Sequence, residues 1–269
     1  MGVPLPKENL EHECFPQPTD PKVRVWRYID FPKLVWALTH NALVLARVDI
    51  LSDKREGRHG KHLRTAVVQS LLRQLDADGS PADRSERRRL ANQIGNLVQL
   101  NEELSRAVSY VSCWCAAGDK ESEAMWQIYA AGGASVALVL PYERLRDSLS
   151  QPELYIGAVA YFDFNKSVVP ADNVFRPTMF KSHEYDYERE VRIVKHDHTL
   201  WVGGGASPTE MQPRPDRPPV ITVPWTVADY VERIVISPYA TQWQADTIRA
   251  AIARLSPGLE TRISESEMT

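Results

Sequence analysis

The residues best placed to do chemistry are three charged side chains that alternate with other residues along one short segment. They are Glu188, Glu190 and Arg192. Because side chains two apart on a strand point the same way, alternation predicts that these three share one face, with Val191 and Ile193 on an apolar face. Three charges beside a packed face need partners, so the strand either lines a polar cleft or holds a salt-bridge network. Paired carboxylates in a cleft can stabilise an oxocarbenium ion or take a proton.

The overall composition bounds the classes of function. The chain has 269 residues, of which 43% are hydrophobic and 25% charged, which is ordinary for a globular protein. A net charge of -3 argues against indiscriminate binding to a polyanion. No apolar run approaches the roughly 20 residues of a membrane span, and the N-terminus lacks the apolar core of a secretory signal. We therefore expect a cytoplasmic protein that does not enter a membrane.

The cysteines favour a reduced chain without a metal centre. Cys113 and Cys115 are too close for a comfortable disulfide, and Cys14 makes the count odd. No set of soft ligands has the spacing of a zinc site. The segment 196–198, His-Asp-His, is the remaining metal candidate, and we expect a solvated turn there instead.

The periodicity of apolar residues predicts an α+β fold. We expect a draped or loose tail at 1–22 and one α+β domain at 23–265, with a helical insertion at 63–106. An exposed loop is expected at 203–219. Strands are expected at 23–28, 43–46, 107–114, 135–140, 154–162, 187–194, 221–224, 231–236 and 259–263. Helices are expected at 31–40, 63–76, 81–106, 120–130, 141–149 and 242–255.

The second helix of the insertion carries an apolar face and a basic face. Five apolar residues recur at helical spacing and predict a face in the core, namely Leu90, Ile94, Leu97, Leu100 and Leu104. The arginines at 84 and 87–89 are expected to be solvated, with a nucleic-acid patch as the alternative.

The basic segment from Lys54 to Arg64 is expected to be an exposed loop. It could instead contact acceptor phosphates, or turn Asp53 and Glu56 inward as site acids.

Five segments in a fixed order resemble the domain of unknown function 2971 family, some of whose members are related to bacterial abortive-infection proteins. The resemblance runs from about residue 23 to 255. The segments are 26–30, 51–57, 112–114 with 125–129, 180–181 with 187–192, and 236–240. Membership of this family alone implies little about activity.

A second resemblance is to the arginine-serine-glutamate class of ADP-ribosyltransferases. It rests on an arginine on the first strand, a serine near a strand end and a later Glu-x-Glu, here Arg27, Ser112, Glu188 and Glu190. The segment 112–114, Ser-Cys-Trp, departs from the usual Ser-Thr-Ser. The resemblance implies an ADP-ribosyltransferase-like mixed β core that uses NAD as a substrate.

The second resemblance also implies a role for each residue. Arg27 would hold a phosphate of NAD, and Ser112 would orient the nicotinamide ribose. Glu190 would bond a ribose hydroxyl and stabilise the oxocarbenium ion, while Glu188 would steer or deprotonate the acceptor. The remaining cofactor-binding residues would be aromatic, namely Tyr28 beside the arginine and Trp126 or Tyr129 stacked on the nicotinamide.

Taken together, these features lead us to expect an NAD-consuming ADP-ribosyltransferase-like enzyme, acting as a toxin effector of bacterial anti-phage defence. Its acceptor would be RNA, DNA or protein, and an antitoxin would be a further partner. One alternative is a non-catalytic defence module that binds a nucleotide or a partner. A second alternative is a metal-dependent nuclease using Asp53, Glu56 and the Glu188/Glu190 pair.

Overall fold

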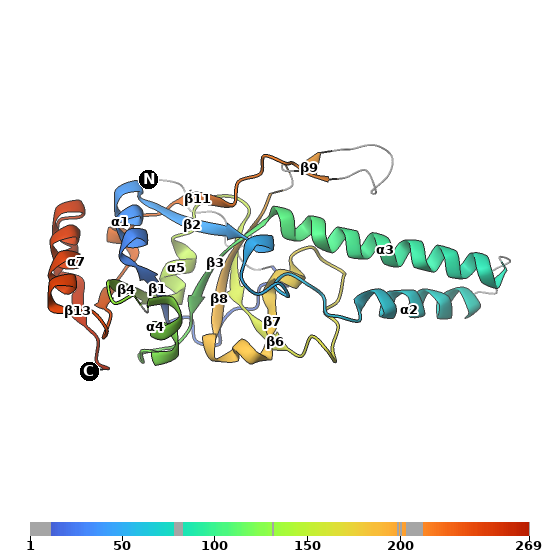
Figure 1. The fold of residues 1–269 in the computed structure, drawn as a ribbon, viewed down its shortest axis with the longest axis horizontal. Coiled ribbons are helices and arrows are strands. Elements are labelled where there is room, and N and C mark those ends of the chain that lie inside the picture. The colour runs from blue at the N-terminus through green and yellow to red at the C-terminus, as the bar shows by residue number, and fades with distance from the viewer. Residues whose placement is uncertain are drawn as a thin grey trace.

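The computed structural model describes residues 12–77, 83–130, 132–197, 199, 201–202 and 212–268. Nine strands of this described part form one mixed sheet (Figure 1). They are β1 (Arg24–Asp30), β2 (Ala42–Arg47), β3 (Ser109–Cys115), β4 (Ser135–Pro141), β5 (Leu154–Ala158), β8 (Glu190–His196), β11 (Val220–Pro224), β12 (Arg233–Ile236) and β13 (Ile263–Glu265). Two small ribbons pair β6 (Ala160–Phe162) with β7 (Phe180–Ser182), and β9 (Trp201–Val202) with β10 (Gln212–Pro213). The expectation of an α+β fold is thereby confirmed.

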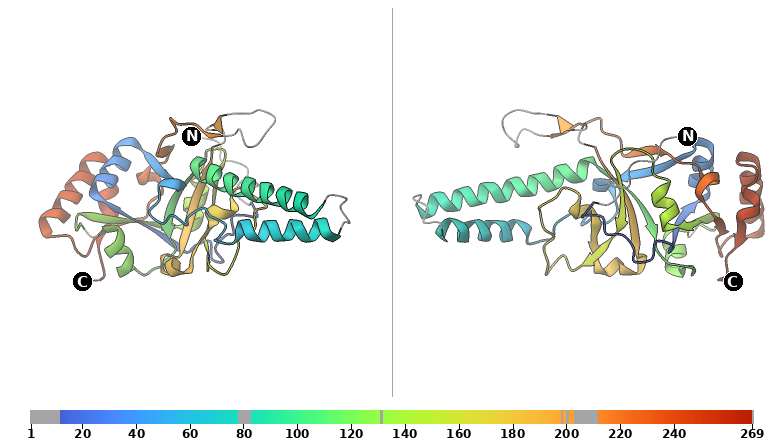
Figure 2. Two further views of the ribbon diagram at one scale, coloured as in Figure 1. Left: turned by 45° about the vertical axis from the view of Figure 1, so that its right-hand side comes forward. Right: turned by 180° about the vertical axis from the view of Figure 1, so that it is seen from behind.

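The helices lie on both faces of the sheet and beyond one end of it (Figures 1 and 2). The α-helices are α1 (Phe31–His40), α2 (Leu63–Ala77), α3 (Arg84–Val108), α4 (Glu123–Ala130), α5 (Tyr142–Asp147), α6 (Val227–Tyr230) and α7 (Gln242–Leu255). Short 3-10 helices occupy Val48–Ile50, Arg176–Met179, His183–Glu188 and Leu259–Arg262. None of these described helices combines the length and the apolar character needed to cross a membrane.

Strand β3 is the branch point of the sheet. Strand β8 pairs with β3 along its whole length, from Ser109 to Cys115. The opposite edge of β3 is shared, because β2 pairs at Val111 and β1 pairs at Cys115. Strands β1 and β2 therefore diverge along this edge, and the sheet continues from β1 through β4 and β12 to β13.

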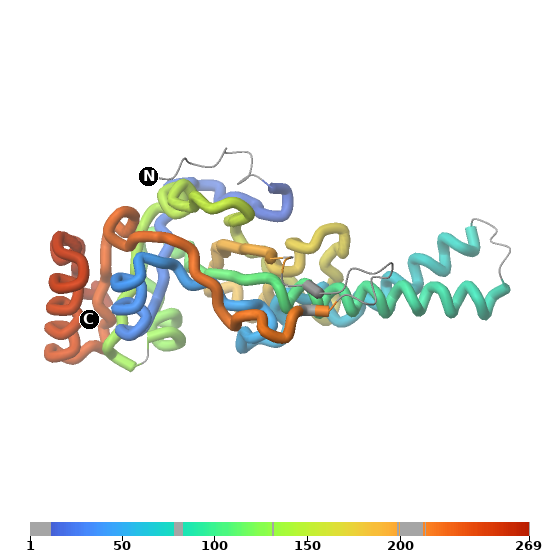
Figure 3. The backbone as a smooth tube through the Cα atoms, turned by 90° about the horizontal axis from the view of Figure 1, so that it is seen from above, coloured from blue at the N-terminus to red at the C-terminus, as the bar shows by residue number. Residues whose placement is uncertain are grey.

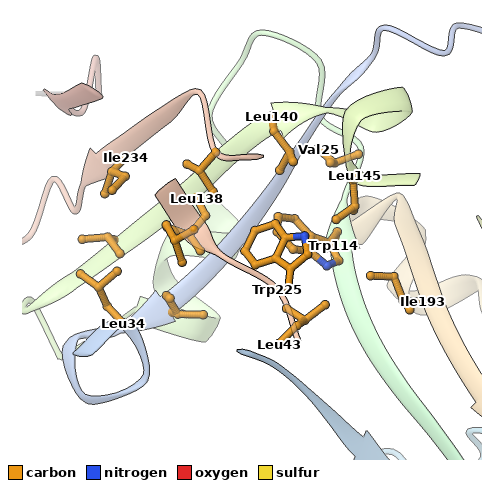
Figure 4. Close-up of a cluster of buried hydrophobic side chains, with 14 of the residues drawn as sticks. Val25, Leu34, Leu43, Trp114, Leu138, Leu140, Leu145, Ile193, Trp225 and Ile234 are labelled. Atoms are coloured by element: carbon orange, nitrogen blue, oxygen red, sulfur yellow. The ribbon is translucent and has the colours of Figure 1, made fainter. Parts of the chain in front are cut away.

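The main hydrophobic core lies on one face of the sheet, under α1, α5 and α7. It is built from alternate residues of the strands, such as Val25, Trp114 and Ile193, and it includes Trp225 (Figure 4). The opposite face is covered in two parts. Helix α4 packs over Trp26 and Tyr28, whereas the N-terminal segment and the 175–180 region pack over the other end.

Most elements lie where the apolar periodicity predicts them. Asp30 caps the start of helix α1, and its side chain accepts a hydrogen bond from Lys33 N at 2.9 Å. Asn41 caps the end of the helix with a left-handed φ of 48°. Helix α7 matches its expected range of 242–255. The expected strand at 154–162 is two strands, and the expected strand at 259–263 is a 3-10 helix followed by β13.

Of the draped or loose tail expected at 1–22, the described residues 12–22 are draped over the sheet and packed against it. Cys14 and Phe15 are buried, and Pro16 O accepts a hydrogen bond from Ala158 N at 2.7 Å. The segment passes directly over Gly157, where an added Cβ would lie 2.8 Å from the Phe15 backbone. Glycine at this position thus lets the N-terminal segment pack against β5 as part of the core.

The helical insertion forms a hairpin of α2 and α3 that projects beyond the sheet (Figures 1 and 3). Its helices confirm the expected ranges to within three residues. The expected core face of α3 is wrong, because Leu90 is 45% and Leu100 37% exposed and only Leu104 of the five apolar residues is buried. The stripe lies outside the core because the projecting helix meets α2 through Ala91 and Gly95 instead.

Candidate functional site

A buried cluster of three carboxylates and two cations lies beside β8. Its members are Glu56, Lys181, Glu188, Glu190 and Arg192, all of them buried. The ammonium of Lys181 lies 2.6 Å from Glu190 Oε1, 2.8 Å from Glu188 Oε2 and 3.3 Å from Glu56 Oε1. The strand at 190–196 therefore holds a salt-bridge network, which is one of the two outcomes expected for its charged face.

The guanidinium of Arg192 completes the network. Its Nε lies 2.6 Å from Glu190 Oε2, and its Nη2 lies 2.5 Å from Glu56 Oε2. Its Nη1 donates to Thr178 O at 2.7 Å. Both oxygens of Glu190 are thus paired with cations, and its backbone N–H donates to Tyr161 Oη at 2.7 Å.

Four separate segments supply these side chains. Strand β8 supplies Glu190 and Arg192, whereas β7 supplies Lys181 and the 51–59 loop supplies Glu56. The prediction that Glu188 lies on the same strand is wrong, because it ends a 3-10 helix and Arg189 follows with a left-handed φ of 43°. The turn at Arg189 nevertheless directs the Glu188 carboxylate into the same cluster.

The charges in the cluster push the two glutamate pKa values apart. Burial and the neighbouring Glu190 raise the pKa of Glu188 to about 7, and Lys181 opposes this rise. Burial alone would raise the pKa of Glu190 as well, but Arg192 and Lys181 hold that pKa well below its usual range. Three carboxylates face only two cations, so one carboxyl of the cluster is the natural carrier of a proton.

Tyrosines surround the cluster on the side of Glu188. Tyr129 is 45% exposed and donates its hydroxyl to Glu188 Oε2 at 3.4 Å, and Tyr187 is 40% exposed. The Tyr185 ring lies between two cations, with Lys181 Nζ 4.8 Å and the Arg55 guanidinium 5.9 Å from its centroid. Exposed aromatic faces beside a proton-carrying carboxylate are suited to hold a planar ligand.

Arg27 and Ser112 form a second polar site, where β1 and β2 diverge. The guanidinium of Arg27 donates to Ser112 Oγ and, at 3.2 Å, to Val44 O, and it lies 5.5 Å from the centre of the Trp114 ring. Among the described residues, burial and the Cys113 thiol are the influences on the charge of Arg27, and no carboxylate is among them. Burial lowers the pKa of Arg27 to about 10.

The sheet separates these two sites. In the register of β3 and β8, Ser112 lies opposite Ile193 on the face of the main core, whereas Cys115 lies opposite Glu190 on the other face. Arg27 alternates with Trp26 and shares the face of Ser112. The structure therefore brings Arg27 to Ser112 and Glu188 to Glu190, but it does not bring the two pairs together.

The three predicted aromatic residues differ in accessibility. Trp126 is fully buried and donates its Nε1–H to Glu121 Oε2 at 2.8 Å. Tyr28 is also buried, and its ring centre lies 4.8 Å from that of Trp126 in an edge-to-face contact. These two rings join α4 to the sheet, so only Tyr129 offers an open face for stacking.

Sequence reasoning missed Lys181 and left Glu56 as an alternative. The expectation of an exposed loop at 54–64 is wrong in part, because Glu56, Gly57 and His59 are buried. Gly57 has a φ of 72°, and an added Cβ would lie 2.7 Å from Val48. A cluster of acids in this loop was a usable signal for Glu56, and the pairing of segment 180–181 with 187–192 in the first resemblance was the available signal for Lys181.

The other candidate ligands are engaged elsewhere. Asp53 pairs with Arg55 at 3.2 Å, and His196 Nδ1 lies 2.9 Å from Ser109 Oγ. The third residue of the expected 196–198 turn lies outside the described residues. The part of the chain that the structure describes contains no group of three His, Cys, Asp or Glu side chains able to hold a metal ion. Its three cysteines are free thiols.

Comparison of the chain with protein-family models, with curated proteins and with solved structures found no match.

Proposed function

We propose that this chain is an ADP-ribosyltransferase-like enzyme whose reacting groups are Glu188 and Glu190. The observation that carries the proposal is that the two buried carboxylates share one cation, since Lys181 Nζ lies 2.8 Å from Glu188 Oε2 and 2.6 Å from Glu190 Oε1. Burial and Glu190 raise the pKa of Glu188, whereas Arg192 and Lys181 lower that of Glu190. Two carboxylates whose environments push their pKa values apart are suited to divide acid–base work from charge stabilisation. Tyr129 and Tyr187 provide exposed aromatic faces beside Glu188.

The proposed reaction uses each carboxylate once. The bond between the nicotinamide nitrogen and the ribose anomeric carbon breaks, and the nitrogen keeps its electron pair. Ionised Glu190 stabilises the resulting oxocarbenium ion. An acceptor nucleophile attacks that carbon and gives its proton to the carboxylate of Glu188, whose pKa is raised by burial and by Glu190. Nicotinamide and an ADP-ribosylated acceptor leave the site.

The assignment of NAD rests on the resemblance to the arginine-serine-glutamate class. The resemblances also support an ADP-ribosyltransferase-like core, kinship with the domain of unknown function 2971 family, and action as a defence toxin on RNA, DNA or protein under an antitoxin. The register of β3 and β8 changes the roles that the resemblance assigns to Arg27 and Ser112. Because Arg27 and Ser112 lie across the sheet from the carboxylates, we assign them to bracing the junction of β1, β2 and β3.

A second candidate function is a non-catalytic binding module. It is favoured by Glu190, which is 4% exposed and has both oxygens paired with cations. In this case the cluster is structural and the tyrosines around Glu188 bind a nucleotide or a partner. The nuclease alternative gains no such support, since the oxygens of Glu56, Glu188 and Glu190 face Lys181 and Arg192.

The test is release of nicotinamide from NAD by the purified chain, with and without cell lysate. We expect release that Glu190→Gln abolishes and that Glu188→Gln reduces by about 10²–10⁴-fold. Glu184→Gln is the matched control, because Glu184 is exposed and its ion pair is with Arg55, outside the carboxylate cluster. Circular dichroism verifies that each variant is folded.

Three results would contradict the proposal. Full activity in Glu190→Gln would remove that residue from the chemistry. No release by the folded wild-type chain, with or without lysate, would favour the binding module. Chelator-sensitive cleavage of RNA or DNA would favour the nuclease.

A further inference from the structure

Helix α3 carries an apolar stripe that the rest of the described chain leaves partly uncovered. The stripe consists of Leu90, Ile94, Leu97, Leu100 and Leu104. Leu90 and Leu100 are exposed, and Ile94 and Leu97 are half-buried. Helix α2 does not cover the stripe, because it meets α3 at Gly95, where an added Cβ would lie 2.7 Å from Val68. A two-helix hairpin in water is a poor place for an unpaired row of leucines.

The half of the stripe near the sheet borders a groove. This groove has a volume of about 420 Å³ and lies between α3 and the segment 171–177. Its apolar lining includes Leu97, Val98, Leu100, Leu104, Val174 and Pro177. The outer half of the stripe, around Leu90, has no comparable cover. Whatever binds here must therefore enter a groove at one end and lie flat along a helix at the other.

Charge is distributed unevenly along the same helix. The outer end carries four arginines, at 84 and 87–89, and two acids, the capping Asp83 and Glu86, and Arg87 pairs with Asp76 of α2 at 3.4 Å. At the inner end, Glu103 and Asp172 are exposed, and Asp172 lines the groove. Glu103 pairs with Arg58 and Arg106, and Asp172 pairs with Arg176, so their exposed oxygens are shared with these arginines. Glu13 lies beside Asp172, since both approach Arg176. An occupant that fits both ends needs an apolar row, with basic residues where it meets the groove.

We propose that the occupant is the α2–α3 hairpin of a second copy of this chain, packed antiparallel. The stripe is symmetric about Leu97, because Ile94 and Leu100 lie three residues away on either side and Leu90 and Leu104 lie seven away. A two-fold axis at Leu97 places Leu90 of each copy at the groove of the other. It also places the outer arginines of each copy near Asp172 and Glu103 of the other. The result is a four-helix bundle, and it does not depend on the proposed function.

The apolar stripe also decides between this occupant and a nucleic acid. Phosphates would meet the arginines at 84 and 87–89, but a polyanion would leave Leu97 and Leu100 in water. Only a partner with both apolar and basic residues satisfies the whole surface. The outer half of α3 itself has that composition.

The first experiment is the molar mass of the full chain by light scattering over a concentration series. We expect a concentration-dependent dimer, with Leu97→Asp shifting the chain to a monomer. Gln99→Asp is the matched control, because it places the same charge on an exposed position of the same helix two residues away. A monomer at every concentration, or a dimer that Leu97→Asp leaves intact, would overturn the proposal.

The second experiment tests orientation and does not require a disruptive substitution. We expect Ile94→Cys mixed with Leu100→Cys to form an interchain disulfide on mild oxidation, whereas either variant alone does not, because an antiparallel pair places 94 opposite 100. The wild-type chain controls for its own thiols. Cross-linking of each variant with itself would indicate parallel pairing. Monomers that bind duplex DNA or RNA through the arginines would assign the surface to nucleic acid, and both results overturn the proposal.

Discussion

The proton on Glu188 links the candidate site to the stability of the fold. Burial and the neighbouring Glu190 raise the pKa of Glu188 from its ordinary value of 4.5 to about 7 in the folded protein. Between these values the folded state holds the extra proton, so the free energy of unfolding falls as pH rises through this window. We expect the melting temperature to fall by roughly a few degrees from pH 5 to pH 7.5, and Glu188→Gln to remove that part of the fall.

Comparing the pH dependence of the melting temperature in wild type and Glu188→Gln isolates the contribution of the Glu188 carboxyl. Glu190 acts in the opposite sense, because its lowered pKa adds stability as pH rises through the acidic range, below the window in question. Glu184→Gln, at an exposed pair, controls for the loss of a carboxylate in general. Equal slopes in wild type and Glu188→Gln would show that this carboxyl is already ionised in the folded protein at pH 5.

The same residues show how far the sequence predicts a site. Alternation within one strand is local, so Glu190 and Arg192 could be placed on one face opposite Val191. The face of Ser112 relative to Glu190 depends on the register of two strands 75 or more residues apart in the chain. A shift of one residue would have put them on the same face, and no local pattern fixes that register.

At the scale of elements, the packing of the N-terminal segment over β5 gives the next prediction. An alanine methyl at Gly157 would lie 2.8 Å from Phe15 Cα, and the backbone there is fixed by the hydrogen bond from Ala158 N to Pro16 O. We expect Gly157→Ala to destabilise the protein by about 1–3 kcal/mol, measured by denaturant unfolding. Gly132→Ala is the control, since nothing lies within 4 Å of its added Cβ.

The result for Gly157→Ala discriminates between two descriptions of this segment. If residues 12–17 are part of the core, the variant loses stability and the segment becomes open to proteolysis. If they are only loosely attached, Gly157→Ala matches Gly132→Ala in both measurements. Composition alone predicts a draped or loose tail, because the segment has several prolines and few core residues. The burial of Cys14 and Phe15 depends on a glycine more than 140 residues away.

Helices were easier to predict than their burial. The ranges of α1, α3 and α7 follow from capping residues and a 3.6-residue period, both of which are local. The same period predicted that Leu90 and Leu100 face a core. Periodicity identifies an apolar face but not what covers it, and here the helix extends past the end of the sheet (Figure 1).

At the scale of the whole molecule, the sheet and the projecting α2–α3 hairpin differ in the number of elements that pack against them. Strand β3 lies between β8 on one edge and β1 and β2 on the other, whereas α2 packs chiefly against α3. The loop at 54–59 connects the two parts, since Glu56 enters the carboxylate cluster and its carbonyl accepts a 2.7 Å hydrogen bond from Arg106 of α3. His59 and Arg58 hold Glu102 of the same helix.

This arrangement predicts a concentration-dependent pattern of amide hydrogen exchange. In dilute solution, α2 and residues 84–95 of α3 should exchange much faster than β3 and β8, because few contacts hold the outer hairpin. If a second copy covers the stripe, raising the protein concentration should slow exchange over 84–104 and leave β4 unchanged. Leu97→Asp should remove the concentration dependence, and Gln99→Asp should retain it. The contradicting result would be seen in dilute Leu97→Asp. If amides of the hairpin exchange as slowly there as those of β3, the hairpin is stable alone and the leucine stripe needs no partner.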